Sequence, residues 1–259
     1  MEPVDSKSGP LHTVVVAVAV CLVCSVLVST TSVLLRPLQA ANRERVRKQQ
    51  VLDIVASQPG LEDLLTELGG VSVEARVVEL DSGAYADWVD PSDYDARRAA
   101  RDPLHSIELL PERDLADIGR RAHLATVYLV QRDGRVELVI LPVYGSGYAS
   151  TLYGYLALGP DGNTVRGLSF HEHGETPGLG SEIEDPDWLA QWVGKRVRDE
   201  SGRVRIGVAA PDAGAETALS SYEVDGLTGA TRTSAGVTGL LRFWLGDDGF
   251  APYLARFQP

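Results

Sequence analysis

One stretch near the N-terminus restricts the possible folds of this chain more than any other part of its sequence. From Leu11 to Leu35 there is no Asp, Glu, Lys or Arg, and Val, Leu and Ala dominate. An α-helix rises about 1.5 Å per residue, so this run can cross the roughly 30 Å hydrocarbon layer of a membrane. Its end offers only Ser29-Thr30-Thr31 as a weak cleavage site. We therefore expect an uncleaved single-span anchor over 11–35 after a short polar tail over 1–10.

Both cysteines of the chain, Cys21 and Cys24, lie in this apolar run. At i and i+3 they share one face of a helix. A redox or iron–sulfur role stays open, and packing of two small residues in a membrane helix is the interpretation that we prefer. The rest of the chain has no cysteine, so it can form neither a disulfide nor a thiolate metal site. The net charge of −12 argues against nucleic acid as a partner.

Charges on the two sides of the run predict an orientation. Five basic residues follow it closely, whereas Lys7 is the one basic residue before it. The five are Arg36, Arg43, Arg45, Arg47 and Lys48. By the positive-inside rule, the domain that follows the anchor would lie in the cytoplasm.

Hydrophobic periodicity and turn residues predict an α+β fold after the anchor. The expected helices cover 38–56, 60–68, 111–122, 187–197 and 237–245, and a polar loop with a short helix covers 81–105. The expected strands cover 72–80, 125–130, 135–143, 151–158, 164–169, 204–208 and 221–224. Arg132-Asp133-Gly134 and Pro160-Asp161-Gly162-Asn163 are typical of hairpin turns. We expect a twisted, mainly antiparallel sheet with flanking helices, a membrane-proximal part over 36–122 and a core with a C-terminal helix over 123–259.

The most unusual segment is Asp225-Gly226-Leu227-Thr228-Gly229-Ala230-Thr231-Arg232-Thr233-Ser234. Its glycines let the backbone bend, and its hydroxyls precede a helix that we expect near Ala235. Thr231, Thr233 or Ser234 could cap that helix, which is the ordinary interpretation. A helix start also offers free N–H groups and a partial positive charge, so the segment also suits a phosphate, although capping alone would explain it.

Two further loops are rich in glycine. His171-Glu172-His173-Gly174-Glu175-Thr176-Pro177-Gly178-Leu179-Gly180 leaves a strand, and Pro142–Thr151 contains Gly-x-Gly with aromatic and hydroxyl residues. His171 and His173 would share a strand face, so a metal site with a nearby glutamate is conceivable, but the spacing matches no strong metal motif. No dinucleotide fingerprint and no catalytic triad stands out. Together the three loops predict a membrane-anchored domain that binds a planar, phosphorylated ligand.

Two of these loops also carry a family resemblance. Asp225–Thr231 resembles the flavinylation signature D-x-x-(S/T)-G-A-T of FMN-binding domains, in which a flavin transferase joins FMN to the last threonine through a phosphoester. The segment 173–180 resembles the companion loop of that domain. The N-terminal span, Tyr144–Leu158 and Phe243-Trp244-Leu245-Gly246-Asp247 extend the likeness. The chain is similar to the C subunits of sodium-translocating NADH:quinone reductases, and the G subunits of Rnf complexes share the FMN-binding core.

The resemblance implies a set of FMN-binding residues. Thr231 matches the threonine that carries FMN, and Thr233 is the nearest rival hydroxyl. The rest of the signature falls on Asp225, Thr228, Gly229 and Ala230. The loop expected against the isoalloxazine ring supplies Glu175, Thr176, Gly178, Leu179 and Gly180, and further contacts are expected from Tyr148, Ser150 and Thr151. Where the family commonly has an aromatic residue, this chain has Ala149, so ring stacking must come from another residue such as Tyr148. The resemblance implies no catalytic residue and no metal.

The resemblance also implies a function. The chain would relay electrons within a six-subunit membrane complex that oxidises NADH, reduces ubiquinone and exports sodium, and it would not be active alone. Its partners would be the other subunits, a flavin transferase and lipid. Its soluble domain would lie on the periplasmic side of the bacterial inner membrane, in conflict with the charge count, and we side with the family. Two alternatives remain: the G subunit of an Rnf ferredoxin:NAD oxidoreductase, and a cofactor-free assembly or binding module.

Overall fold

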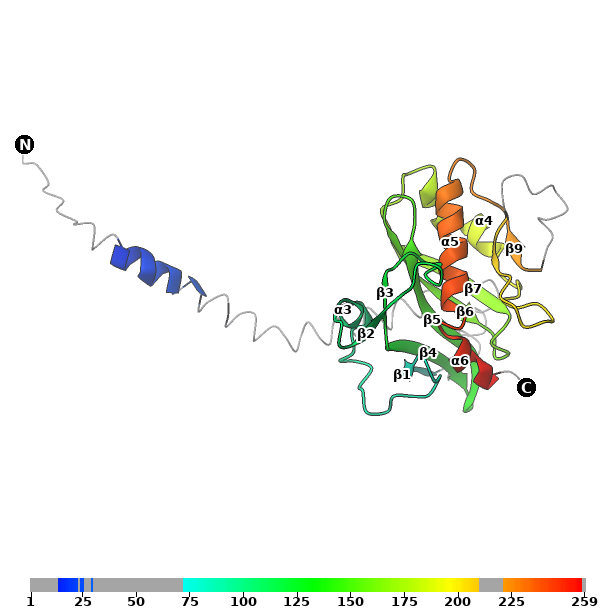
Figure 1. The fold of residues 1–259 in the computed structure, drawn as a ribbon, viewed down its shortest axis with the longest axis horizontal. Helices are drawn as coiled ribbons and strands as arrows, with labels where there is room; N and C mark the ends of the chain where they lie inside the picture. Colours follow the sequence, from blue (N-terminus) through cyan, green and yellow to red (C-terminus); the bar gives the residue numbers. More distant parts are fainter. Residues whose placement is uncertain (1–13, 23, 26–28, 30–71, 210–220, 258–259) are drawn as a thin grey trace, which may run out of the picture. The chain divides into compact units, whose positions relative to one another are not determined.

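The computed structural model describes residues 14–22, 24–25, 29, 72–209 and 221–257 (Figure 1). The chain divides into two compact units, Met1–Arg47 and Lys48–Pro259. In the first unit, the described residues are helical and exposed. Over all the described ranges, no helix is both long enough and apolar enough to cross a membrane. Much of the predicted anchor over 11–35, and the whole of the predicted helices over 38–56 and 60–68, lie outside those ranges.

A five-stranded antiparallel sheet forms the centre of the second unit, in the order β1-β4-β5-β6-β7. Its strands are β1 (Ser72–Glu79), β4 (Leu124–Arg132), β5 (Arg135–Ser146), β6 (Thr151–Leu158) and β7 (Val165–Glu172). Asp133 and Gly134 connect β4 to β5 with positive φ angles of 50° and 74°, as a two-residue hairpin turn requires. In the turn from β6 to β7, the Asp161 carboxylate accepts hydrogen bonds from the backbone of Asn163 and Thr164. The predicted antiparallel sheet and both hairpins are confirmed.

Smaller elements surround the sheet. The antiparallel pair is β2 (Ser106–Glu108) with β3 (Arg120–Ala122), and the parallel pair is β8 (Gly207–Val208) with β9 (Glu223–Val224). The helices are α3 (Ala96–Arg101), α4 (Pro186–Ala190), α5 (Thr231–Trp244) and α6 (Ala251–Leu254), with 3₁₀ turns η1 (Gly180–Glu184) and η2 (Ala255–Phe257).

Two helix predictions are wrong, for local reasons. The segment 111–122 forms turns and then β3, because the Asp114 carboxylate accepts hydrogen bonds from the N–H groups of Ile118 and Gly119 and so competes with helical pairing. The helix predicted over 187–197 stops at Ala190, and the chain turns at Gly194 with a φ of +82°. The buried tryptophans of this segment nevertheless pack in the core, as predicted.

Helix α5 lies across one face of the sheet and contacts β5 (Figure 1). The approach is close because both elements lack side chains at the crossing. A Cβ atom at Gly236 would lie 2.3 Å from the carbonyl oxygen of Ser146, and one at Gly145 would lie 2.6 Å from the Cβ of Leu240. Val237, Leu240, Leu241, Phe243 and Trp244 of α5 are all buried in the main core. This packing fixes the N-terminus of α5 beside the end of β5.

Candidate functional site

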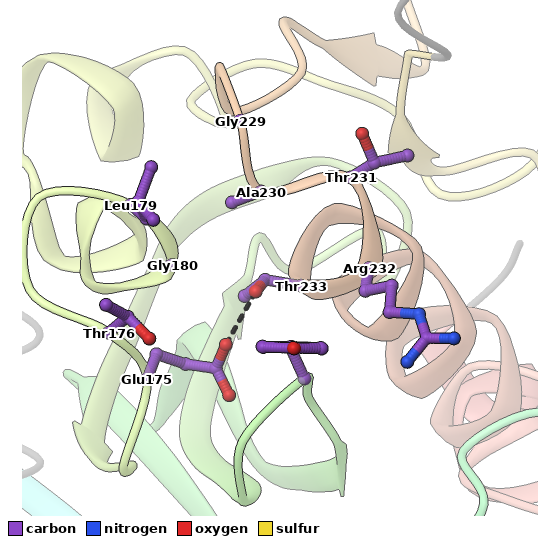
Figure 2. Close-up of a pocket in the computed structure, with 10 residues that line it drawn as sticks. Glu175, Thr176, Leu179, Gly180, Gly229, Ala230, Thr231, Arg232 and Thr233 are labelled. Carbon is purple, nitrogen blue, oxygen red and sulfur yellow. Dashed lines mark hydrogen bonds between the residues drawn. The ribbon is translucent and has the colours of Figure 1, made fainter.

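A pocket of about 220 Å³ lies at the N-terminus of α5 (Figure 2). Its walls come from the three glycine-rich loops that the sequence singled out. The lining residues are Tyr148, Glu175, Thr176, Leu179, Gly180, Gly229, Ala230, Thr231, Arg232 and Thr233. Although 85 positions separate the first of these residues from the last (148 to 233), the fold brings them around one space.

The start of α5 differs from the prediction. The helix begins at Thr231, with Ala230 as its N-cap and no side chain capping it. The expected capping by Thr231, Thr233 or Ser234 is therefore wrong, because these residues lie within the first helical turn. Gly229 supplies the bend that precedes the helix, with a φ of +74°. The N–H groups of an uncapped first turn and the positive end of the helix dipole suit an anionic ligand.

The four hydroxyls around this helix start differ in accessibility. Thr233 is 1% exposed and donates a 2.6 Å hydrogen bond to Oε2 of Glu175. Ser234 is also buried, and its hydroxyl accepts a hydrogen bond from the N–H of Leu227. Thr228 is exposed but is not among the residues that line the pocket. Thr231 is exposed and lines the pocket, so it is the hydroxyl of this segment that a ligand there can reach.

The carboxylate of Glu175 joins the three loops. It is buried, and it accepts a hydrogen bond from the hydroxyl of Thr233 (Figure 2). It also accepts one, at 2.9 Å, from the N–H of Ala149. A Cβ atom at Gly147 would lie 2.5 Å from its Oε1, and one at Gly180 would lie 2.5 Å from its Oε2. Glycine at both positions thus lets the loops close around one carboxylate.

Two large apolar side chains form partly exposed walls of the pocket. Leu179 is 44% exposed and Tyr148 is 61% exposed. Gly229 allows Leu179 to approach, since a Cβ atom there would lie 3.0 Å from Cδ2 of Leu179. Such surfaces suit the faces of a planar aromatic ligand, which would cover apolar area now open to water. Tyr148 therefore occupies a wall of the pocket, whereas its neighbour Ala149 does not line it.

Sequence reasoning missed Arg232 at this site. Its guanidinium carbon lies 5.7 Å from the centroid of the Tyr148 ring, and the residue lines the pocket. A signal was present, because Arg232 directly follows the threonine at the end of the signature. The signature ends at Thr231 and the helix was expected to begin only near Ala235, so nothing else in the sequence placed the Arg232 side chain at the pocket.

Five predicted site residues do not line the pocket: Asp225, Thr228, Gly178, Ser150 and Thr151. Three of them organise the loops instead. The carbonyl oxygen of Asp225 accepts a 2.8 Å hydrogen bond from the indole of Trp188, which ties the segment before α5 to α4. The Ser150 hydroxyl accepts a hydrogen bond from the N–H of Gly174. Gly178 turns its loop with a φ of +73°.

The two histidines of the second loop make separate contacts. His171 stacks on Tyr155 with the ring centroids 5.0 Å apart, and burial together with the charge of Arg97 lowers the pKa of His171. His173 accepts a hydrogen bond at Nδ1 from the N–H of Glu175, and its Nε2 lies 3.0 Å from Oε1 of Glu184. In the part of the chain that is described, no three His, Cys, Asp or Glu side chains converge as metal ligands.

These features fit an aromatic ligand with a phosphate group. The uncapped start of α5 suits the phosphate, Leu179 and Tyr148 suit the ring, and Gly180 and Gly229 leave room for close approach. The family model described as FMN-binding domain matches residues 147–246, a range that includes every residue lining the pocket. The site and fold thus define an FMN-binding domain.

Relatives that match nearly the whole chain identify the kind of FMN-binding protein more closely. The chain is 45% identical over 255 residues to the C subunit of the Na(+)-translocating NADH-quinone reductase of Pseudomonas aeruginosa, covering 98% of both chains. It is 42% identical to the protein of the same name from Vibrio parahaemolyticus, covering 94% of this chain and 93% of the other. The crystal structure of Shewanella oneidensis NqrC matches with a TM-score of 0.69 and 33% identity, over 84% of this chain and 98% of that chain. The chain therefore belongs to the family formed by the C subunits of Na(+)-translocating NADH-quinone reductases.

Proposed function

We propose that this chain is the electron-transfer subunit of a sodium-pumping NADH:ubiquinone oxidoreductase, with FMN attached to Thr231 through a phosphoester. The observation that carries the proposal is the position of Thr231, an exposed residue that lines the pocket at the uncapped start of α5. The rival Thr233 is buried and already bonded to Glu175. The family relationship supports the same assignment, and it favours this complex over the Rnf type.

Different residues of the pocket would bind different parts of such a cofactor. The Thr231 oxygen bonds to the phosphorus, and the N–H groups of the first turn of α5 stabilise the phosphate charge. Leu179 and Tyr148 would provide the apolar surfaces that cover the ring. Glu175 keeps the three loops at a fixed separation. The flavin supplies the electron-transfer chemistry when it is bound, and the protein supplies position and electrostatics.

The proposal includes a place in the membrane. The uncharged run over 11–35 is the anchor, and the domain that follows lies on the periplasmic side of the bacterial inner membrane. The other subunits of the complex orient the span against the positive-inside rule. A flavin transferase loads the chain, and lipid surrounds the anchor. The periplasmic location can be tested with the single substitutions Ser82→Cys and Ser201→Cys, both in exposed turns, and a thiol-reactive label. Labelling by an impermeant reagent in intact spheroplasts supports it, and labelling only after lysis overturns it.

Mass spectrometry tests the covalent linkage. The full chain is coexpressed with a flavin transferase, together with Thr231→Ala and the control Ser201→Ala, which removes an exposed hydroxyl outside both the pocket and the signature. We expect an adduct of FMN less one water on the peptide that contains Thr231, present in the control and absent in Thr231→Ala. An adduct that persists in Thr231→Ala would move the site to another hydroxyl. A wild-type chain with no adduct would favour the cofactor-free module.

A further inference from the structure

The pocket contains one acidic and one basic side chain among its described lining residues, and their situations differ. The acidic one, Glu175, is buried, and both of its oxygens accept hydrogen bonds from the protein. The basic one, Arg232, is exposed, and within the described ranges it forms no ion pair. The charge of Glu175 is therefore already used in holding the loops, whereas that of Arg232 is available to a ligand.

The direction of the Arg232 side chain indicates which part of a ligand it would meet. Thr231 and Arg232 are consecutive residues of the first turn of α5, so their side chains diverge by about 100° around the helix. Figure 2 shows the hydroxyl of Thr231 and the guanidinium of Arg232 leaving the helix start in different directions. The guanidinium reaches the ring of Tyr148, at 5.7 Å. It therefore belongs to the aromatic wall of the pocket and points away from the atom proposed to carry the phosphate.

We propose that Arg232 raises the reduction potential of the flavin ring by placing a positive charge beside the Tyr148 wall. This inference rests on the proposed function. Each electron that enters the ring adds negative charge unless a proton follows, and a nearby cation stabilises that charge. Tyr148 also helps to hold the guanidinium, because an arginine favours the face of an aromatic ring.

The expected effect is moderate because Arg232 is exposed. Water weakens the interaction of a surface charge with its neighbours, so the full strength of a buried charge does not apply. We expect removal of the charge to change the one-electron reduction equilibrium about tenfold, which is a shift of about 59 mV.

Spectroelectrochemical titration of the flavin-loaded full chain tests the inference. The variants are Arg232→Gln, which removes the charge, and Arg232→Lys, which keeps it. Arg135→Gln is the matched control, because Arg135 is exposed at the far end of β5, a strand of 12 residues, and thus roughly 35 Å along the strand from the pocket. We expect a lower potential in Arg232→Gln, a potential near that of the wild type in Arg232→Lys, and no change in Arg135→Gln.

A further variant separates an effect of charge from an effect on loading. In Arg232→His the charge can be removed after the flavin is attached, as the pH rises through about 6.5. We expect its potential to fall relative to that of Arg232→Lys over this range. Intact mass measured before each titration shows whether the chain is loaded. A wild type without flavin would refute the proposed function itself. Loaded variants whose potentials shift no more than that of Arg135→Gln, with no pH-dependent difference for Arg232→His, would overturn the role of Arg232 alone.

Discussion

Removal of the Glu175 carboxylate is the perturbation that most directly tests how the pocket is held together. In Glu175→Ala the Thr233 hydroxyl loses its acceptor at a site that is 1% exposed, which costs about 1–3 kcal/mol. The N–H of Ala149 loses its acceptor as well, at a position open enough for water to replace it, for about 1 kcal/mol. The expected loss is therefore about 2–4 kcal/mol, a large part of the stability of an ordinary domain.

A double-mutant cycle with Thr233 sharpens this prediction. Thr233→Val removes the hydroxyl and keeps the branched shape, so in the wild type it costs about 1–3 kcal/mol by leaving the buried carboxylate short of a donor. In the Glu175→Ala background the same change removes a donor that has no partner. It should then be neutral or stabilising, which gives a coupling energy of about 1–3 kcal/mol. Glu175→Gln should cost only about 1 kcal/mol, because an amide can accept from Ala149 and donate to Thr233.

Urea-induced unfolding of the flavin-free full chain measures these free energies. The fluorescence of Trp188, Trp192 and Trp244 reports on the core, since all three are buried. The flavin transferase is left out, so that cofactor loading does not differ between variants. If Thr233→Val costs the same in both backgrounds to within about 0.5 kcal/mol, the two side chains are not coupled and the described role of Glu175 is wrong.

Two other regions yield further predictions. Burial raises the pKa of Asp161, but the hydrogen bonds from Thr164 and Asn163 outweigh it and the net pKa is lowered. The ionised form thus stabilises the fold above the unfolded pKa of about 3.9, and this contribution disappears as the pH falls through the folded value. Asp161→Asn should cost up to about 1 kcal/mol at pH 7 and progressively less as the pH falls below about 3.9, and a loss that does not change with pH would contradict this. Gly236→Ala should lower stability by about 1–3 kcal/mol or more in the same unfolding assay, because its Cβ would meet the Ser146 carbonyl. The control Gly178→Ala, where the space is open but φ is positive, should cost only about 1 kcal/mol, and a comparable loss in both would refute the close approach of α5 to β5.

The sequence predicted the sheet well because its signals are local. Asp133-Gly134 determines a two-residue turn by its own conformational preferences, and the apolar runs on either side then pair. The helix over 111–122 could not be excluded in the same way, since the hydrogen bonds from Asp114 that replace helical pairing depend on a turn at Gly119 with a φ of +68°. Likewise, the run of hydroxyls before Ala235 suggested a cap, whereas the helix had already begun at Thr231.

The sequence predicted which loops form the site, but it did not predict the contacts between their side chains. The signature and the companion loop identified seven of the ten lining residues, because those segments carry a recognisable pattern, and Tyr148 and Thr233 were expected as further candidates. The bond between Glu175 and Thr233 spans 58 positions, and no local pattern indicates which hydroxyl a distant carboxylate will hold. The same limit applies to Arg232, whose significance depends on its distance from Tyr148.

The convergence of three distant loops on Glu175 also makes the pocket depend on how α5 is packed. The β5–β6 loop and the segment after β7 extend directly from strands of the sheet, whereas the third wall is held in place by the packing of α5 against β5. A chain interrupted before residue 229 would lack the third wall of the pocket and the core residues of α5. Conversely, a group lodged among all three loops opposes local detachment of α5, since it favours only the closed arrangement. A ligand in this pocket should therefore stabilise the C-terminal part of the domain against local unfolding.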